Sequence, residues 1–525
     1  MVLWRNLAAG FAASILGAIV ALAAAPIYVR SLGIEAYGLI GFFTAMQAVF
    51  AILDLGLAPT MSREVARCQV NGEVAQARDL LRTLAIFYWA VAALIALTTL
   101  LGAHWLAHDW LQARHLDLET LARAVALMGG VIALRFPVGL YNGVLQGAQQ
   151  IARASTIQIV MTLLANLGAV LILRHVANTV EAFFLWQLAL AVVSVVVVRW
   201  AAWHALSDSR KPVFDFVALK RVWRFSAGLG VVAVLSILLT QLDKMVLSRM
   251  ADLSELGRYT LAGLAARSLT LVITPVFNVI YPRFSALVAK DDMPRIAALY
   301  TLGTRLLLAV ILPIAAYVAV FSTEIFKLWT GNVSLALAIR PLIAFLVLGT
   351  ALNGVMTFPY ALQLAYGYSR LPAIIVAALV VGFVPLLLGL VYWHGAEGAA
   401  WSWAILNAAY LPFGAWLTHR YMLQGLVRRW LARDVGLPVL VTMVMVGGGG
   451  LLIHDLIPVD IYRLLAGAVL VPGVLAVVVA LTPSFALEVQ RWRRLVRRPP
   501  APGTALAEYP PPSPIIQGDR FESPR

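Results

Sequence analysis

The sequence predicts an all-α integral membrane protein of about fourteen transmembrane helices. We expect two six-helix lobes related by a pseudo-twofold axis along the membrane normal, followed by two C-terminal helices. Of 525 residues, 62% are apolar and 12% are charged, with a mean hydropathy of +0.87, whereas soluble chains carry about 25% charged residues. Apolar runs long enough to cross a bilayer recur along the chain. In addition, features of the first half return about 222 residues later.

The apolar runs place the helices in order, and the first run is long enough to be a retained helix, not a signal peptide. The domains follow as an N-lobe (1–206), a cytoplasmic linker (207–224), a C-lobe (225–420), two further helices (421–482) and a cytoplasmic basic, proline-rich, disordered tail (483–525). The predicted spans are 6–29, 38–58, 82–106, 121–148, 152–174, 181–204, 225–249, 256–282, 300–322, 335–365, 371–393, 397–418, 436–454 and 462–482.

Charge and cysteine usage exclude several classes of protein. Most of the 40 Lys and Arg residues fall in loops on the side of the membrane that holds both termini, so we predict that both termini are cytoplasmic. This topology accounts for the net charge of +15 without a nucleic-acid partner. A lone cysteine, Cys68, excludes a disulfide framework, and the eight histidines lack metal-ligand spacing. Because no catalytic motif is present, we predict neither an enzyme nor a cofactor or metal site.

The internal repeat predicts where a site should lie. Tyr37, after the first span, matches Tyr259, and Pro137 in the fourth span matches Pro359 in the tenth. Each copy contains an even number of spans, so both copies cross the membrane in the same orientation. A substrate site is then expected between the copies, near the membrane midplane.

Arg135 is the residue on which the functional prediction depends. It lies roughly 20 Å from either end of its span, close to the bilayer centre. A guanidinium at that depth costs several kcal/mol unless it faces water, protein or an anion. We therefore predict that Arg135 lines a cavity and binds an anion, with a structural partner in the bundle as the alternative. Thr357 occupies the corresponding position of the second copy, so the site should be asymmetric.

Other polar residues inside the spans are weaker candidates. Arg267 is the second predicted cavity cation, although it could instead pair with Asp243. The alternative role of Asp54 is a helix-end salt bridge, and the alternative role of Arg305 is to snorkel toward the membrane surface. The amide side chains could instead form hydrogen bonds between helices. The candidate gate or coupling residues are Asp54, Arg63, Asp243, Lys244 and Arg305, and the candidate sugar contacts are Asn142, Gln146, Asn353 and Gln363.

Three stretches resemble the polysaccharide-unit, or O-antigen, flippases of the multidrug/oligosaccharidyl-lipid/polysaccharide exporter superfamily. Residues 26–67 are similar to the first helix pair of that family, residues 241–287 carry similar LDK, LGxY and PRFS motifs, and residues 143–150 (GVLQGAQQ) are similar to the end of its fourth helix. The likeness extends over the first twelve spans. It does not reach the tail after residue 483.

This resemblance implies two lobes around a cavity and a function in surface polysaccharide synthesis, such as that of lipopolysaccharide O-antigen. The implied activity is to move a polyprenyl-pyrophosphate-linked glycan from the cytoplasmic to the periplasmic leaflet of the bacterial inner membrane by alternating access. Membrane lipids and other polysaccharide assembly proteins are the implied partners. The cavity cations of the family would correspond to Arg135 and Arg267.

Three alternatives remain at this stage. An ion-coupled drug or small-molecule antiporter of the same superfamily would need carboxylates in its cavity, whereas the midplane charges here are arginines. A membrane-embedded glycan polymerase or ligase usually needs a large outer loop or a cytosolic domain. A scaffold for envelope assembly would not need charge at the midplane.

Overall fold

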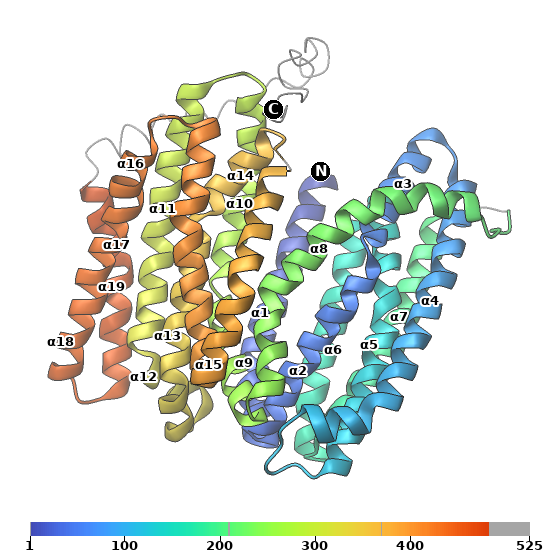
Figure 1. The fold of residues 1–525 in the computed structure, drawn as a ribbon, viewed down its shortest axis with the longest axis horizontal. Helices are drawn as coiled ribbons and strands as arrows, with labels where there is room; N and C mark the ends of the chain where they lie inside the picture. Colours follow the sequence, from blue (N-terminus) through green and yellow to red (C-terminus); the bar gives the residue numbers. More distant parts are fainter. Residues whose placement is uncertain (1, 208–209, 369, 482–525) are drawn as a thin grey trace, which may run out of the picture. The chain divides into compact units, whose positions relative to one another are not determined.

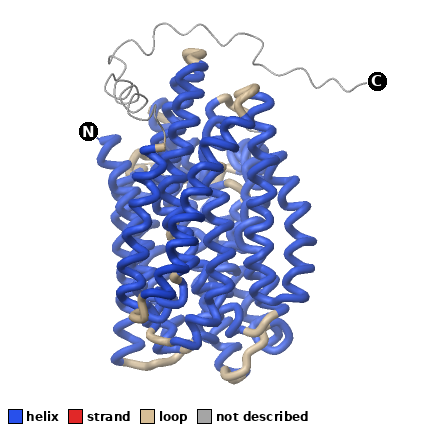
Figure 2. Tube along the Cα trace, turned by 90° about the vertical axis from the view of Figure 1, so that its left-hand side faces the viewer, coloured by secondary structure: helices blue, strands red, loops and turns tan. Residues whose placement is uncertain are grey.

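The computed structural model describes residues 2–207, 210–368 and 370–481. All regular elements in these ranges are helices, joined by short loops (Figures 1 and 2). The chain forms two units, Met1–Leu475 and Ala476–Arg525. The tail predicted for residues 483–525 lies outside the described residues.

The first group of helices packs around α5. Helix α5 contacts α3, α4 and α7, while α1 lies against α6 (Figure 1). The elements of this group are α1 (Val2–Leu32), α2 (Ile34–Ala51), η1 (Ile52–Asp54), α3 (Leu57–Asn71), α4 (Val74–Trp105), η2 (Leu106–Trp110), α5 (Leu118–Gly147), α6 (Ile151–His175) and α7 (Val180–Ala205).

The second group packs around α13, which contacts α9, α11, α12 and α15. Its elements are α8 (Phe216–Met250), α9 (Leu253–Arg267), α10 (Thr270–Val288), α11 (Met293–Val320), α12 (Ser322–Thr330), α13 (Val333–Val355), α14 (Thr357–Ala365) and α15 (Arg370–Met422). The chain continues through α16 (Val427–Arg429), η3 (Trp430–Val435), α17 (Gly436–Thr442), η4 (Met443–Gly448), α18 (Gly449–Leu456) and α19 (Asp460–Ala480).

Twelve stretches of helix in the described residues are long and apolar enough to cross a membrane. One of them, Leu371–Met422, contains two helices, because Gly395 has φ 53° and ψ −132° and interrupts α15. Helices α8 and α9 are not among the twelve. The chain is therefore an all-helical multi-pass membrane protein. The count of fourteen spans, the pseudo-twofold axis and the lobe boundaries stay predictions.

Several helices begin where the sequence supplies a capping side chain. Asp117 accepts a hydrogen bond from the Thr120 amide at 2.9 Å at the start of α5, and Asp252 accepts one from the Glu255 amide at 2.7 Å at the start of α9. Asn332 accepts one from the Leu335 amide at 3.0 Å at the start of α13. Such oxygens satisfy amides that a helix leaves without partners in its first turn.

Three predicted spans are broken in the structure. The eighth, 256–282, is divided between α9 and α10 at Ser268 and Leu269. The second span ends at η1, where Leu55 (φ 49°) and Gly56 (φ 76°) adopt left-handed backbone conformations before α3 begins. The tenth is divided between α13 and α14, and Pro359 lies in the first turn of α14. Pro137, its match in the repeat, lies inside the continuous helix α5. A proline in a first helical turn loses no hydrogen bond that the helix would make, so the two matched positions differ structurally.

Candidate functional site

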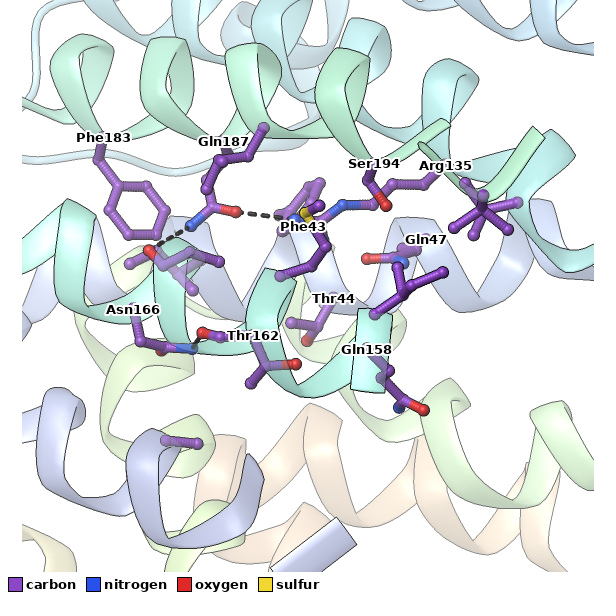
Figure 3. A pocket seen from close by; sticks show the side chains of 18 of the residues that line it. Phe43, Thr44, Gln47, Arg135, Gln158, Thr162, Asn166, Phe183, Gln187 and Ser194 are labelled. Atoms are coloured by element: carbon purple, nitrogen blue, oxygen red, sulfur yellow. Dashed lines mark hydrogen bonds between the residues drawn. The ribbon is translucent and has the colours of Figure 1, made fainter. Parts of the chain in front are cut away.

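A cavity of about 530 Å³ lies among α1, α2, α5, α6 and α7, and Leu264 of α9 also lines it (Figure 3). Among the described residues, Arg135 is its one charged lining side chain, and no carboxylate lines it. Hydroxyl and amide groups make up the remaining polar lining, contributed by Tyr28, Tyr37, Thr44, Gln47, Asn142, Gln158, Thr162, Asn166, Gln187 and Ser194.

The guanidinium of Arg135 is held by neutral groups. Its Nη2 donates a hydrogen bond to Oε1 of Gln187 at 2.7 Å, and its central carbon lies 5.7 Å from the centre of the Phe43 ring (Figure 3). Gln187 is 7% exposed, and its Nε2 lies 3.5 Å from the carbonyl oxygen of Ala165. Within the described residues Arg135 forms no ion pair. Among the described residues, therefore, no carboxylate neutralises the charge of this cavity cation.

Helical spacing places the polar groups on the cavity wall. On α5, Arg135, Gly139 and Asn142 are spaced so that they share one face. On α6, Gln158, Thr162 and Asn166 recur every four residues, which gives a polar stripe on an otherwise apolar helix. This stripe is visible in the sequence.

Gln187 lines the cavity beside Arg135 and was not predicted from the sequence. A single amide inside the apolar helix α7 carries no periodic signal, and Gln187 is 52 residues from Arg135 along the chain. Thr44 and Gln47 of α2 were likewise not singled out. Only the packing of the helices brings them to the cavity that Arg135 lines.

Arg267 does not line this cavity in the described structure. It is exposed at the end of α9, where its Nη2 donates to the carbonyl oxygen of Thr240 at 3.3 Å. Leu264, one helical turn earlier, does line the cavity, so Arg267 lies on the same face of α9 but further along it. The alternative pairing with Asp243 is wrong for this structure: Asp243 accepts hydrogen bonds from the Tyr259 hydroxyl and the Lys244 amide.

The predicted gate residues have local partners. Asp54 accepts hydrogen bonds from the Tyr88 hydroxyl and, at 3.3 Å, from the Ala58 amide. These partners are neutral, so they are not the helix-end salt bridge given as its alternative. Arg63 is paired with Glu64 at 2.8 Å. Lys244 is 5% exposed, and its Nζ donates to Oε1 of Gln241 at 3.2 Å.

Arg305 forms a buried ion pair, so the snorkelling interpretation is wrong. Its Nε donates to Oδ1 of Asp434 at 3.1 Å, and the two side chains are 12% and 2% exposed. Trp430 of η3 donates its Nε1–H to Thr304 of α11 at 3.2 Å. Two adjacent residues of α11 therefore anchor η3, which gives Arg305 a structural role that we did not predict.

Of the four predicted sugar contacts, one lines the cavity and three do not. Asn142 lines the cavity, whereas Gln146 is exposed outside it. Asn353 donates a hydrogen bond to Asn407 at 2.9 Å. Gln363 is fully buried and donates to Thr418 at 2.7 Å, so a sugar contact for Gln363 is wrong and the interhelical hydrogen bond is what the structure has.

An all-helical, multi-pass bundle with a cavity of about 530 Å³ lined by a cation from an apolar helix is an architecture suited to a membrane transporter. Solved structures share this fold. The lipid II flippase MurJ in an inward closed conformation matches with a TM-score of 0.67 at 12% identity, covering 93% of this chain and 99% of that chain. An inward-facing multidrug resistance transporter of the MATE family, within the MOP superfamily, matches with a TM-score of 0.62 at 16% identity, covering 77% and 96%.

The family model described as "Polysaccharide biosynthesis protein" matches residues 3–288, more than half of the chain, and the chain belongs to this family. A curated relative from Shigella flexneri, named "Putative O-antigen transporter", is 20% identical over 405 residues, which cover 77% of this chain and 91% of the relative. These relatives are transporters, not enzymes.

Proposed function

We propose that this protein is a flippase that moves a polyprenyl-pyrophosphate-linked oligosaccharide from the cytoplasmic to the periplasmic leaflet during surface polysaccharide synthesis. One observation carries the proposal: Arg135 is a cation in a membrane-embedded cavity, and among the described residues it contacts an amide and an aromatic ring. The family match, and the flippase and O-antigen transporter among its relatives, support this function.

The chemistry of the cavity suits a phosphorylated sugar. A buried charge is stabilised by an opposite charge, and truncation of one partner of such a pair is strongly destabilising. The pyrophosphate of the substrate would supply the missing negative charge, with the planar guanidinium donating to two of its oxygens. The hydroxyl and amide side chains around it can exchange hydrogen bonds with sugar hydroxyls as water does. Arg135 would thus bind the headgroup while the amides replace its hydration.

The transport cycle follows the predicted topology. We place the protein in the bacterial inner membrane with both termini cytoplasmic, and we assign the helices through α7 to an N-lobe and helices α8–α15 to a C-lobe. Rocking of one lobe against the other would expose the cavity to each leaflet in turn. Arg267, one turn beyond the cavity on α9, would be a second cation that the pyrophosphate meets as the lobes move. The lipid tail would stay among membrane lipids, and other polysaccharide assembly proteins would supply and take up the glycan.

The alternative of an ion-coupled drug antiporter is less well supported by the lining. A cationic drug or a coupling proton needs a carboxylate in the cavity, and among the described lining residues there is none. The cavity is suited to an anion.

Reconstitution into proteoliposomes with a labelled polyprenyl-pyrophosphate sugar tests the proposal. A charge-assisted hydrogen bond is worth about 1.5–3 kcal/mol, so Arg135→Gln should weaken translocation about 10- to 150-fold at limiting substrate. The matched control is Arg123→Gln on the same helix, because Arg123 is exposed and paired with Glu119 at 2.9 Å. Arg267→Gln should have a smaller effect than Arg135→Gln. Equal translocation by wild type and correctly inserted Arg135→Gln would refute the anion site.

A further inference from the structure

We propose that two neighbouring contacts form the gate that closes the cavity at the end of the bundle where the α4–α5 loop lies. The first is a glycine contact between α2 and α9. The second, the polar clamp, joins Glu35 of α2 and Asp252 at the start of α9 to the α4–α5 loop. Under the predicted orientation this end faces the periplasm. The inference rests on the proposed transport function only in assuming that the cavity opens alternately to the two sides. It assigns gating roles to Glu35, Gly38, Asp252 and Gly257.

The two helices meet with their backbones in contact. A Cβ on Gly38 would overlap the carbonyl oxygen of Leu253, and a Cβ on Gly257 would overlap the carbonyl oxygen of Ile34. The contact is reciprocal, since each glycine faces the residue four positions before the other glycine. Tyr37, next to Gly38, lines the cavity. The glycine contact is therefore part of the structure that bounds the cavity, and it requires both residues to lack a side chain.

Glu35 forms the centre of the polar clamp. It lies on α2 one turn before Gly38, it is 6% exposed, and its carboxylate accepts hydrogen bonds from the α4–α5 loop. Its partners are the Arg114 amide at 2.6 Å, the His115 amide at 3.0 Å and Nδ1 of His115 at 2.8 Å. A buried carboxylate held by two backbone amides is a specific contact, because an unpartnered carboxylate there would be strongly disfavoured.

The same loop also holds the start of α9. The backbone of Gln112 bridges to Asp252, and the Leu253 amide donates to the Gln112 carbonyl at 3.0 Å. Asp252 pairs with Arg114 at 3.0 Å, although Arg114 is 72% exposed and this ion pair alone contributes little. The loop thus ties α2, through Glu35, to the first turn of α9, through Asp252.

A second clamp joins the two groups of helices through α1. Nε of Arg30 donates to the carbonyl oxygen of Thr330 at 2.7 Å, at the last turn of α12, where a cation also complements the helix dipole. Trp329 in turn donates its Nε1–H to the Leu22 carbonyl of α1 at 3.0 Å.

These contacts are of a kind that can open and reform. Glycine backbones in contact separate without withdrawing large apolar side chains from pockets, and water can take over the released hydrogen-bonding groups at a helix end. Substituting a glycine at this contact should therefore destabilise the closed gate selectively. It should not disrupt the packing within either group of helices.

Cysteine accessibility tests the gate without any substrate. The single native cysteine, Cys68, is buried and would be replaced by alanine; Thr162→Cys then places a near-isosteric thiol in the cavity. In right-side-out vesicles, labelling by a membrane-impermeant maleimide reports access from the α4–α5 loop side under the predicted orientation, and inverted vesicles report the other side. Gly257→Ala should raise loop-side labelling about tenfold, which corresponds to about 1.4 kcal/mol.

The matched control is Gly263→Ala, the same change on the same helix at a position where a Cβ would meet nothing within 4 Å. Equal labelling of Gly257→Ala and Gly263→Ala would overturn the proposal.

If Gly257→Ala does not fold, a Gln112→Cys/Asp252→Cys pair gives the opposite test, because bridged residues lie within disulfide reach. Its oxidation should suppress loop-side labelling and its reduction should restore it; unchanged labelling would again overturn the gate. If loop-side labelling changes as expected but the protein does not translocate the sugar lipid, the proposed function is refuted and the gate is not.

Discussion

Gln187→Glu tests whether the unneutralised charge of Arg135 binds the substrate. The substitution changes almost nothing in shape, but it puts a carboxylate where an amide oxygen now accepts from Arg135 at 2.7 Å. Two opposite charges about 4 Å apart attract by about 4 kcal/mol at an effective dielectric constant of 20. The new carboxylate would compete with the pyrophosphate for the guanidinium. Allowing for desolvation of the new carboxylate, we expect binding of the headgroup to weaken at least about 100-fold, or about 2.7 kcal/mol.

The assay is binding and translocation of a labelled polyprenyl-pyrophosphate sugar in proteoliposomes at neutral pH, with thermal unfolding measured in parallel. Gln187→Met is the matched control, since it removes the hydrogen bond without adding charge and should cost only about 1 kcal/mol in positioning of the guanidinium. Gln187→Glu should lose transport while unfolding at a higher temperature than Gln187→Met, because the new ion pair stabilises the fold. Equal transport by Gln187→Glu and wild type would refute the reasoning, as would equal losses in both variants.

Three further predictions concern stability and the cavity wall. Burial raises the pKa of Glu64 on α3, but hydrogen bonds and charge from two neighbouring arginines outweigh burial and leave that pKa below its ordinary value. The ionised carboxylate therefore stabilises the fold above the unfolded pKa, near 4.3. This stabilisation is lost as pH falls through the lower folded pKa. The difference in thermal unfolding between wild type and Glu64→Gln should accordingly shrink on acidification, and a constant difference would contradict this. Asp434→Asn should cost about 3–5 kcal/mol of folding free energy because it removes the buried carboxylate that pairs with Arg305, and the double replacement with Arg305→Met should recover most of the loss in denaturant titrations. Asn142→Leu should reduce sugar-lipid transport and Gln363→Leu should not, since only Asn142 lines the cavity; the reverse order would show that the cavity is misassigned.

Local sequence signals predicted much of the fold. Within the described residues, most of each predicted span is helical, and several helices begin at residues that cap them, such as Asp252 before α9. Gly56 and Pro359 are candidate bending points in the sequence, but hydropathy did not show that the helices break there. Leu55 and Gly56 lie in an apolar stretch, and nothing in hydropathy separates a continuous helix from one that turns through left-handed backbone conformations. The amphipathic helix α3 therefore emerged only from the structure.

For the site, the sequence by itself determined that a cation lies deep in a membrane, because Arg135 is flanked on both sides by apolar residues sufficient to span a bilayer. It also determined the polar stripe on α6, through four-residue spacing. Which groups meet that cation was decided only by the tertiary structure. Gln187 reaches Arg135, Arg267 stays outside the cavity, and Arg305 is paired with Asp434. The physical reason is that periodicity defines the faces of each helix, whereas rotation and depth relative to neighbouring helices depend on side-chain packing and glycine contacts between residues far apart in the chain.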